Sequence, residues 1–315
     1  MNIVFLDEST ATLGDIDLTG LRSLGSYSGF SDSTQKQAVE RAADADVIIV
    51  NKVPVTAALL DTLRRLKLVS VVATGYNNID ASAARKRNVC VCNVPGYATR
   101  SVAQHTFCLI LNLATKIHLY NSDIRAGQWE KASSFNLLTY PTFELAGKTM
   151  GIIGFGMIGR EVAAMAQAFS MKVLAYDVRG IEDGSQPNTG LETLLAESDV
   201  VSLHCPLTEE NRNLIDADAL AAMKTTSLLI NTARGGLVDE RALFEALEKG
   251  QIAGAGVDVI SEEPPIKGNV LLRARNIIVS PHSAWSTREA RQRLIDETAR
   301  NIKAFFDGKP RNVVI

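Results

Sequence analysis

Four side chains suited to acid–base chemistry or anion binding directly follow predicted β-strands. His282 comes after the last predicted strand, Arg234 precedes a Gly-Gly pair, and Glu262 and Glu263 follow a third strand. The carboxyl ends of strands in a parallel α/β sheet face the ligand crevice, so we expect these loops to meet there. An imidazole exchanges a proton near neutral pH, and a guanidinium grips a carboxylate through two hydrogen bonds. The sequence therefore predicts a site that binds an organic acid and moves a proton.

Other residues compete for these roles. His204 also ends a predicted strand and is the rival acid–base group, whereas His105 and His118 lie on a long helix, where His105 suits packing or an interdomain contact. A surface ion pair is the alternative for Arg234. For Glu262 and Glu263, the functional interpretation is a carboxylate that hydrogen-bonds a histidine and fixes its tautomer. The alternative is an acidic loop capped by prolines, with no role in catalysis, and we favour this alternative for Glu262.

A glycine-rich turn predicts the cofactor. Gly154, Gly156 and Gly159 form G-x-G-x-x-G between an apolar strand and a helix at 160–169. In this fingerprint the glycines allow a tight turn, close approach of a pyrophosphate and close helix packing, so we expect the pyrophosphate over residues 156–158, which include Met157 and Ile158. Asp177 follows the next strand, where it would bind the ribose hydroxyls of NAD and repel the 2′-phosphate of NADP. The alternative is a glycine-rich turn of another α/β sheet.

Composition restricts the class of protein. The chain has 315 residues, 46% of them hydrophobic, and a net charge of -2. This length favours two domains, and the charge excludes a basic nucleic-acid surface. No apolar segment is long enough to span a membrane, and the N-terminus has no signal-peptide pattern, so we expect a cytoplasmic protein. No metal site is expected, and we interpret the cysteines as reduced core or near-core thiols: Cys90, Cys92, Cys108 and Cys205.

Strands and helices alternate along both halves of the chain, which is typical of parallel α/β sheets. In the first half we expect strands at residues 3–6, 47–50, 68–73 and 90–93, and helices at 34–43, 56–63 and 81–87. In the second half we expect strands at 151–153, 172–176, 200–203, 228–231, 256–259 and 277–280, and helices at 191–196, 217–223 and 240–249.

Two further segments complete the predicted organisation. A long helix at 101–118 leads into an irregular aromatic segment, 120–145, which we expect to be a buried arm, packed against a partner subunit. The last helix, 287–306, is expected to cross back to the first block. The predicted domains are therefore 1–98 with 287–315, and 99–286, with a ligand cleft between them.

Taken together, these motifs resemble the D-isomer-specific 2-hydroxyacid dehydrogenases over essentially the whole chain. The matching segments are residues 154–159, 231–236, 258–264 and 281–282. The resemblance implies an NAD-binding Rossmann domain inserted in a flavodoxin-like substrate domain. It also implies that Arg234 binds the substrate carboxylate and keto oxygen, that His282 is the acid–base group, and that Glu263, which directly precedes a proline, hydrogen-bonds His282.

The resemblance implies further binding residues and a homodimer. On the cofactor side these are Cys205, Pro206, Thr232, Ala233 and Asp258, the last beside the carboxamide. On the substrate side they are Lys52, the loop residues Thr74, Gly75 and Tyr76, and Trp285. Two positions depart from the family pattern. Many members have arginine or serine near Lys52, and many have glutamate where this chain has Gln104.

Within the family, the motifs are most similar to those of enzymes that interconvert hydroxypyruvate and D-glycerate with NAD(H). Glyoxylate or another 2-keto acid is an alternative substrate. Phosphoglycerate dehydrogenases and formate-type dehydrogenases are further alternatives, which the expected lack of additional terminal segments disfavours. A corepressor-like protein that senses dinucleotides is the alternative outside enzymes, because a fold alone does not fix function.

Overall fold

The computed structural model describes residues 1–315 and divides them into two compact units. The terminal unit combines Met1–Ala98 with Trp285–Ile315, and the central unit is Thr99–Ala284. The second boundary lies between residues 284 and 285, where the sequence favoured 286 and 287. No helix is long and apolar enough to cross a membrane.

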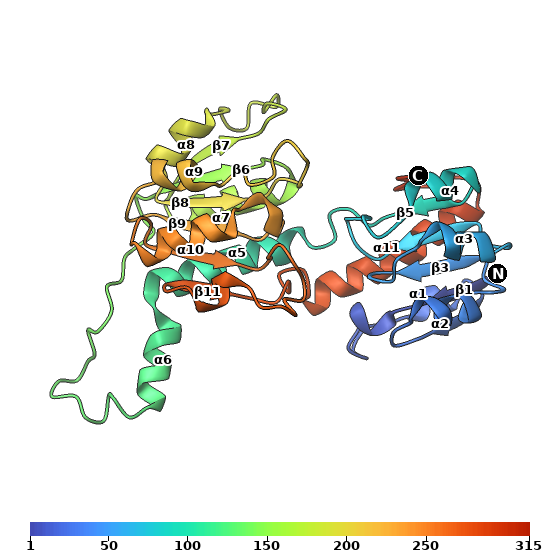
Figure 1. The fold of residues 1–315 in the computed structure, drawn as a ribbon, viewed down its shortest axis with the longest axis horizontal. Helices are drawn as coiled ribbons and strands as arrows, with labels where there is room; N and C mark the ends of the chain where they lie inside the picture. Colours follow the sequence, from blue (N-terminus) through green and yellow to red (C-terminus); the bar gives the residue numbers. More distant parts are fainter. The chain divides into compact units, whose positions relative to one another are not determined.

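The terminal unit is built on a five-stranded parallel sheet in the order β2-β1-β3-β4-β5, of which Figure 1 labels β1, β3 and β5. This is the 2-1-3-4-5 order of flavodoxin-like folds. All residues of β3 and β4 are buried, as expected for strands covered on both faces. The strands are β1 Asn2–Phe5, β2 Ser26–Gly29, β3 Val47–Val50, β4 Leu68–Val71 and β5 Cys90–Cys92. The helices are η1 Glu8–Thr10, α1 Thr19–Arg22, α2 Gln35–Arg41, α3 Ala57–Thr62, α4 Ala81–Lys86 and α11 Arg288–Phe306.

Helix α11 completes the core of the terminal unit, although it is remote in sequence from the sheet. Its buried residues Leu294, Ile295 and Ile302 cluster with Phe5 and Val47 of the central strands. The apolar face of α11 therefore covers one face of the sheet, as the sequence predicted for a helix that returns to the first block.

The central unit holds a six-stranded parallel sheet in the order β11-β10-β9-β8-β6-β7. A parallel bridge between Ala175 and Asn188 extends it beyond β7. With that bridge as the third strand, the order is the 3-2-1-4-5-6 of a Rossmann fold plus one further strand. The strands are β6 Thr149–Ile153, β7 Lys172–Tyr176, β8 Val200–Leu203, β9 Leu228–Asn231, β10 Gly254–Val257 and β11 Ile277–Val279. The helices are α5 Thr99–Thr115, α6 Ile117–Arg125, α7 Met157–Ala168, α8 Leu191–Glu197, α9 Ala217–Ala222, η2 Gly235–Leu237, α10 Glu240–Glu248 and η3 Val270–Arg273.

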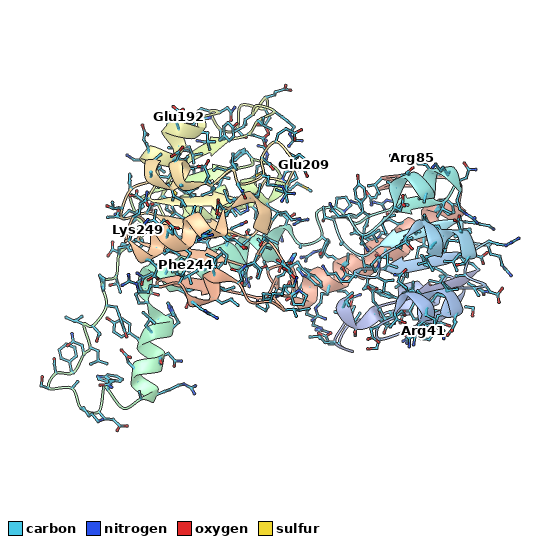
Figure 2. The ribbon with its side chains drawn as sticks, viewed as in Figure 1. Arg41, Arg85, Glu192, Glu209, Phe244 and Lys249 are labelled. Carbon is cyan, nitrogen blue, oxygen red and sulfur yellow. The ribbon has the colours of Figure 1, made fainter.

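The helices expose charged side chains on their outer faces. Figure 2 shows Arg85 of α4, Glu192 of α8 and Lys249 at the end of α10 on the surface of their units. The parallel-sheet α/β class and its two sheets were thus predicted correctly from alternating apolar strands and amphipathic helices.

Two expectations about local structure were wrong. Strand β2 was missed, because Ser26–Gly29 is a largely exposed edge strand without an apolar run. The long helix ends at Thr115, and α6 begins after Lys116, which has a left-handed backbone. The predicted arm is exposed in the single chain, with Phe135 and Leu138 each 87% exposed, and α6 and the segment after it project from the central unit (Figure 1). Its burial against a partner subunit stays a prediction.

Candidate functional site

The six strands of the central unit end in one row across the sheet. Paired in register, their last residues are Tyr176, Ile153, Leu203, Asn231, Val257 and Val279. The loops that follow these residues therefore start at the same edge. That edge carries all the predicted cofactor and catalytic residues of this unit.

Glu263 and His282 are in direct contact, although 19 residues separate them. The Glu263 Oε2 atom lies 2.5 Å from His282 Nδ1, and Glu263 Oε1 accepts a hydrogen bond from the Ile260 N–H at 3.0 Å. Because a carboxylate only accepts, the proton in this contact belongs to Nδ1. The pair fixes the tautomer of the imidazole and directs proton exchange to Nε2.

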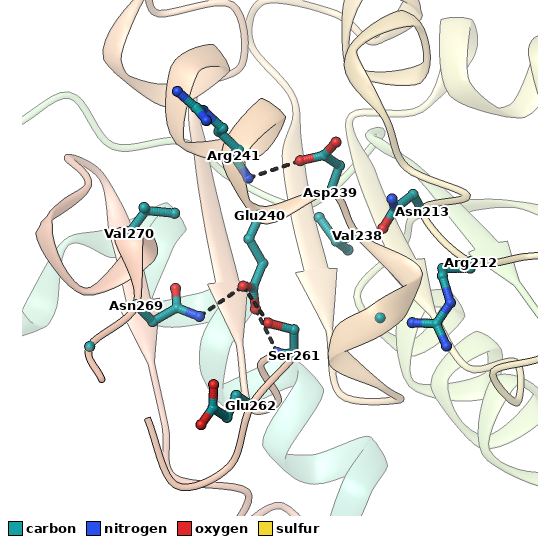
Figure 3. Close-up of a pocket in the computed structure, with 12 residues that line it drawn as sticks. Arg212, Asn213, Val238, Asp239, Glu240, Arg241, Ser261, Glu262, Asn269 and Val270 are labelled. Carbon is teal, nitrogen blue, oxygen red and sulfur yellow. Dashed lines mark hydrogen bonds between the residues drawn. The ribbon is translucent and has the colours of Figure 1, made fainter. Parts of the chain in front are cut away.

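A second glutamate anchors the loop that carries Glu263. Glu240, at the start of α10, accepts hydrogen bonds from the N–H and hydroxyl of Ser261, both at 2.6 Å, and from Asn269 Nδ2 at 2.8 Å (Figure 3). These residues and Glu262 line an open polar pocket of about 420 Å³. Arg234, Glu263 and His282 do not line this pocket, so Glu262 and Glu263 belong to different surroundings.

The backbone of His282 is left-handed, with φ of 52°. This conformation is uncommon for a residue with a side chain and persists only where its surroundings fix it. Here the His282 N–H donates to the carbonyls of Asp258, at 2.7 Å, and Ser280, at 3.1 Å. The Asp258 carboxylate in turn accepts the N–H groups of Ser283 and Ala284, both at 2.9 Å. Strand β10 ends at Val257, so Asp258 lies in the loop rather than on the strand as expected.

Arg234 is exposed, and its Nη1 atom donates to the Ala233 carbonyl at 2.6 Å. Buried Asn231 closes the turn before it, because its side chain accepts from the Ala233 N–H and donates to the Arg234 carbonyl. A Cβ atom on Gly235 would lie 2.0 Å from the Ile260 carbonyl carbon. Only glycine therefore allows the Arg234 loop to pack on the loop that leads to Glu263.

The rival histidines have other surroundings. His204 Nε2 bonds to the Ser202 hydroxyl, its Nδ1 is buried without a partner, and burial lowers its pKa to about 3. Such a group stays neutral and is poorly suited to proton transfer near neutral pH. His118 lies on α6, outside the loops at the sheet edge. His105 does more than pack, because it contacts Ser280 at the sheet edge.

The glycine turn has the space that a dinucleotide requires. Added Cβ atoms on Gly154 and Gly159 would clash with backbone at 2.5 and 2.3 Å, whereas one on Gly156 would meet nothing within 4 Å. Gly156 caps α7, and exposed Met157 and half-buried Ile158 form its first turn. The open approach to Gly156 and the N-terminus of α7 fit a pyrophosphate.

Asp177 lies beside this turn and is charged at neutral pH. Its carboxylate accepts the N–H groups of Phe155 and Arg179, both at 3.0 Å. Desolvation alone would raise the pKa of Asp177, but these hydrogen bonds and the Arg179 guanidinium outweigh it and lower the pKa. At the end of β8, burial raises the pKa of the Cys205 thiol to about 11, so Cys205 stays protonated. Cys108, by contrast, is exposed, which corrects the expectation that all four thiols lie in or near the core.

In the terminal unit, the predicted substrate residues lie on loops after β3 and β4. Lys52 is exposed, and its loop wraps around buried Asp7, whose carboxylate accepts the N–H groups of Lys52, at 2.6 Å, and Val53, at 2.9 Å. Asn78 Nδ2 donates to the Val53 carbonyl at 3.0 Å and joins the two loops. These contacts fix the backbone beside Lys52.

The remaining predicted residues have local supports. Asn93 Nδ2 donates to the Thr74 carbonyl at 2.7 Å, while Gly75 and Tyr76 stay at least partly exposed. Trp285 packs edge-on against Tyr97, with ring centroids 6.2 Å apart. Exposed Pro206 and buried Thr232 follow β8 and β9. The binding roles of all these residues stay predictions.

Sequence reasoning missed the residues that support the site. Asn231, Glu240 and Asp7 hold the loops of Arg234, Glu263 and Lys52, respectively. Only Asn231 had a local signal, because an asparagine at a strand end often closes a turn with its side chain. The others act on residues 21 to 46 positions away, which no local pattern reveals.

Comparison with known proteins agrees with this architecture. Residues 107–284 match the family model described as D-isomer specific 2-hydroxyacid dehydrogenase, NAD binding domain. A glycerate dehydrogenase of Methylorubrum extorquens is 46% identical over 283 residues, 89% of each chain. A hydroxypyruvate reductase of Blautia hydrogenotrophica is 39% identical over 100% of this chain and 99% of the relative. Other relatives are named glyoxylate reductase.

A solved structure shares the whole fold. The NAD-complexed D-isomer specific 2-hydroxyacid dehydrogenase of Lactobacillus delbrueckii ssp. bulgaricus is 27% identical, with a TM-score of 0.84 over 100% of both chains. The central unit is therefore an NAD-binding domain. The chain belongs to the D-isomer specific 2-hydroxyacid dehydrogenase family.

Proposed function

We propose that this oxidoreductase reduces hydroxypyruvate to D-glycerate with NADH, or catalyses the reverse reaction. The observation that carries the proposal is the contact between Glu263 and His282, at 2.5 Å. The loop that leads to Glu263 packs against Gly235, which directly follows Arg234. An oriented imidazole and an exposed guanidinium, on loops that pack together, are suited to a substrate that has both a carboxylate and a carbonyl.

Each residue has one task in this proposal. NADH, when bound over Gly156, supplies the hydride. Arg234 binds the substrate carboxylate and polarises the keto oxygen, because a guanidinium remains charged and offers several donors. His282 gives the proton to that oxygen through Nε2, and Glu263 keeps the ring oriented. Lys52, the backbone at Thr74 to Tyr76, and Trp285 are proposed to hold the rest of the substrate.

The choice of hydroxypyruvate rests on the relatives, since glycerate dehydrogenase and hydroxypyruvate reductase share 46% and 39% identity with this chain. Glyoxylate is the second candidate, because relatives of 38% and 39% identity are named glyoxylate reductase. We propose NADH over NADPH because charged Asp177 would repel a 2′-phosphate. Asp258, Cys205, Pro206, Thr232 and Ala233 are proposed to line the nicotinamide end of the cofactor site.

The test is NADH oxidation at neutral pH with hydroxypyruvate, glyoxylate, pyruvate, phosphohydroxypyruvate and a branched 2-keto acid, each repeated with NADPH. We expect the largest kcat/KM with hydroxypyruvate and NADH. A larger value for another acid would keep the reaction class and change the substrate. NADH binding without turnover of any acid would overturn the enzyme reading and favour a dinucleotide sensor.

We also propose that the chain is a cytoplasmic homodimer. Its cysteines are all free thiols, as is usual in a reducing compartment. The arm exposes Ile124, Trp129, Phe135 and Leu138, and exposed apolar clusters mark interfaces. Sedimentation analysis should give a dimer for the wild type and monomer for Phe135→Ser with Leu138→Ser. Monomeric wild-type protein at micromolar concentration would contradict the dimer.

A further inference from the structure

The first turns of α5 bind the loops at the edge of the central sheet through polar side chains. Ser101 Oγ donates to the Ala284 carbonyl at 2.6 Å, and His105 Nε2 lies 2.8 Å from Ser280 Oγ. Ser101 and His105 are four residues apart, so they share one face of the helix. The proposed reaction assigns no task to His105, which is nevertheless only partly exposed, with 23% of its side chain accessible.

The donors and acceptors around Ser280 determine which ring nitrogen of His105 carries a proton. Ser280 Oγ lies 2.6 Å from Asp258 Oδ1 and donates its single proton there, because the carboxylate has none to give. The Ser280 oxygen must then accept in its contact with His105, so Nε2 of His105 carries a proton. The same Nε2 atom lies 3.5 Å from Asp258 Oδ1.

Asp258 is the residue on which this chain of contacts converges. Its side chain is 1% exposed, and its Oδ1 atom lies 3.5 Å from His105 Nε2. The Oδ1 atom accepts from Ser280 and Ser283, whereas Oδ2 accepts from Ala284. Each carboxylate oxygen has two lone pairs, so Oδ2 retains capacity for one more donor. The Asp258 carbonyl also holds the His282 N–H at 2.7 Å.

We propose that His105 is a positioning residue for the nicotinamide end of the site. By donating to Ser280, it fixes the Asp258 carboxylate so that Oδ2 can accept a hydrogen bond from the carboxamide of the cofactor. The same contact steadies the left-handed backbone of His282. This inference rests on the proposed function, in which Asp258 lies beside the carboxamide.

The test compares binding of NADH with binding of reduced 3-acetylpyridine adenine dinucleotide, in which a methyl ketone replaces the carboxamide. The analogue has no N–H to donate to Asp258. Affinities are measured by titration calorimetry without substrate for wild type, His105→Ala and His105→Gln. We expect His105→Ala to weaken NADH binding about 3- to 10-fold, as for one lost hydrogen bond, and to leave the analogue unaffected. His105→Gln should restore NADH binding, because its amide can donate to Ser280.

Gln104→Ala is the matched control, since Gln104 is the exposed neighbour on the same helix. An equal loss for both dinucleotides, or unchanged NADH affinity in His105→Ala, would overturn the proposal and show a packing role or none. Wild-type protein that binds NADH but turns over no 2-keto acid would refute the proposed function, while the two affinities would still decide the role of His105. Wild-type protein that binds no NADH would refute both.

Discussion

Glu263 and Asp258 hold two different parts of His282, its ring and its main chain. Glu263 fixes the ring through Nδ1, and Asp258 fixes the main chain through its carbonyl. A residue with φ of 52° stores backbone strain, which the surrounding hydrogen bonds offset. The position of the imidazole therefore depends on the Glu263 carboxylate, which contacts the ring, and on the Asp258 carbonyl, which contacts the main chain.

Replacing His282 with alanine should lower kcat by about 10²- to 10⁴-fold, because a positioned proton donor is typically worth that much. NADH affinity should change little, since the cofactor cradle lies on other loops. Stopped-flow reduction and calorimetric NADH titration separate these effects. His118→Ala is the control, because His118 lies on α6. A variant with wild-type turnover would exclude His282 as the proton donor.

Replacing Asp177 with asparagine should raise the ratio of NADPH to NADH kcat/KM about tenfold. The native carboxylate is charged, and like charges about 4 Å apart repel by about 1–4 kcal/mol, depending on solvent exposure. Glu182→Gln, in the exposed loop that follows, is the matched control. An unchanged ratio in Asp177→Asn would mean that Asp177 does not discriminate between the ribose of NADH and the 2′-phosphate of NADPH.

At the scale of elements, the three glycines between β6 and α7 make different demands. Gly154 and Gly159 have backbone atoms closer than 3 Å to an added Cβ, so they serve the fold itself. Gly156 faces open space, so it serves the ligand. In this turn, Gly154 and Gly159 are thus needed for packing, whereas Gly156 is needed for ligand binding.

Gly156→Ala should fold with an unchanged melting temperature and bind NADH about tenfold or more weakly, because the new methyl group occupies the path of the pyrophosphate. Gly190→Ala is the control, since Gly190 also caps a helix and has open space around it. Calorimetry gives the affinity and thermal unfolding gives the stability. Native affinity in Gly156→Ala would place the pyrophosphate elsewhere.

Much of this arrangement of elements was predictable, because buried parallel strands are continuous apolar runs. Strands β3 and β9 were predicted with the bounds that the structure gives. Strand β2 was not, since Ser26–Gly29 pairs with a buried neighbour but buries little itself. The break at Lys116 has no glycine or proline to mark it, so a continuous helix was expected there.

The site was predictable in its parts and less so in its connections. Residue types at strand ends indicated His282 and Arg234, and the family resemblance selected Glu263 over Glu262. The contacts of Glu240 with Ser261, and of Asp7 with Lys52, depend on how distant loops pack. Such contacts are properties of the folded unit and leave no periodic pattern in the chain.

At the scale of the whole molecule, one partly buried histidine ties stability to pH. Burial lowers the pKa of His204 from 6.5 to about 3. Between these pH values His204 is protonated in the unfolded chain but not in the folded chain. The free energy of unfolding therefore falls as pH falls, by about 1.4 kcal/mol per pH unit from this group. Above pH 6.5 the group has no effect.

Urea unfolding at pH 7 and pH 5 tests this. We expect His204→Gln to lose less stability between the two pH values than the wild type, because glutamine cannot take up the proton. His118→Gln is the comparison, because His118 is exposed and its pKa is lowered less than that of His204, so this variant should change the pH dependence less. Equal losses in the wild type and His204→Gln would mean that other groups dominate acid unfolding.

The use of both chain ends in the terminal unit has a consequence for synthesis. Met1–Ala98 leaves the ribosome first, yet its core lacks Leu294, Ile295 and Ile302 until the last residues emerge. The central unit is continuous and has its whole sheet earlier. During translation one apolar face of this sheet therefore stays uncovered until α11 has been made, while the other face already has its own helices.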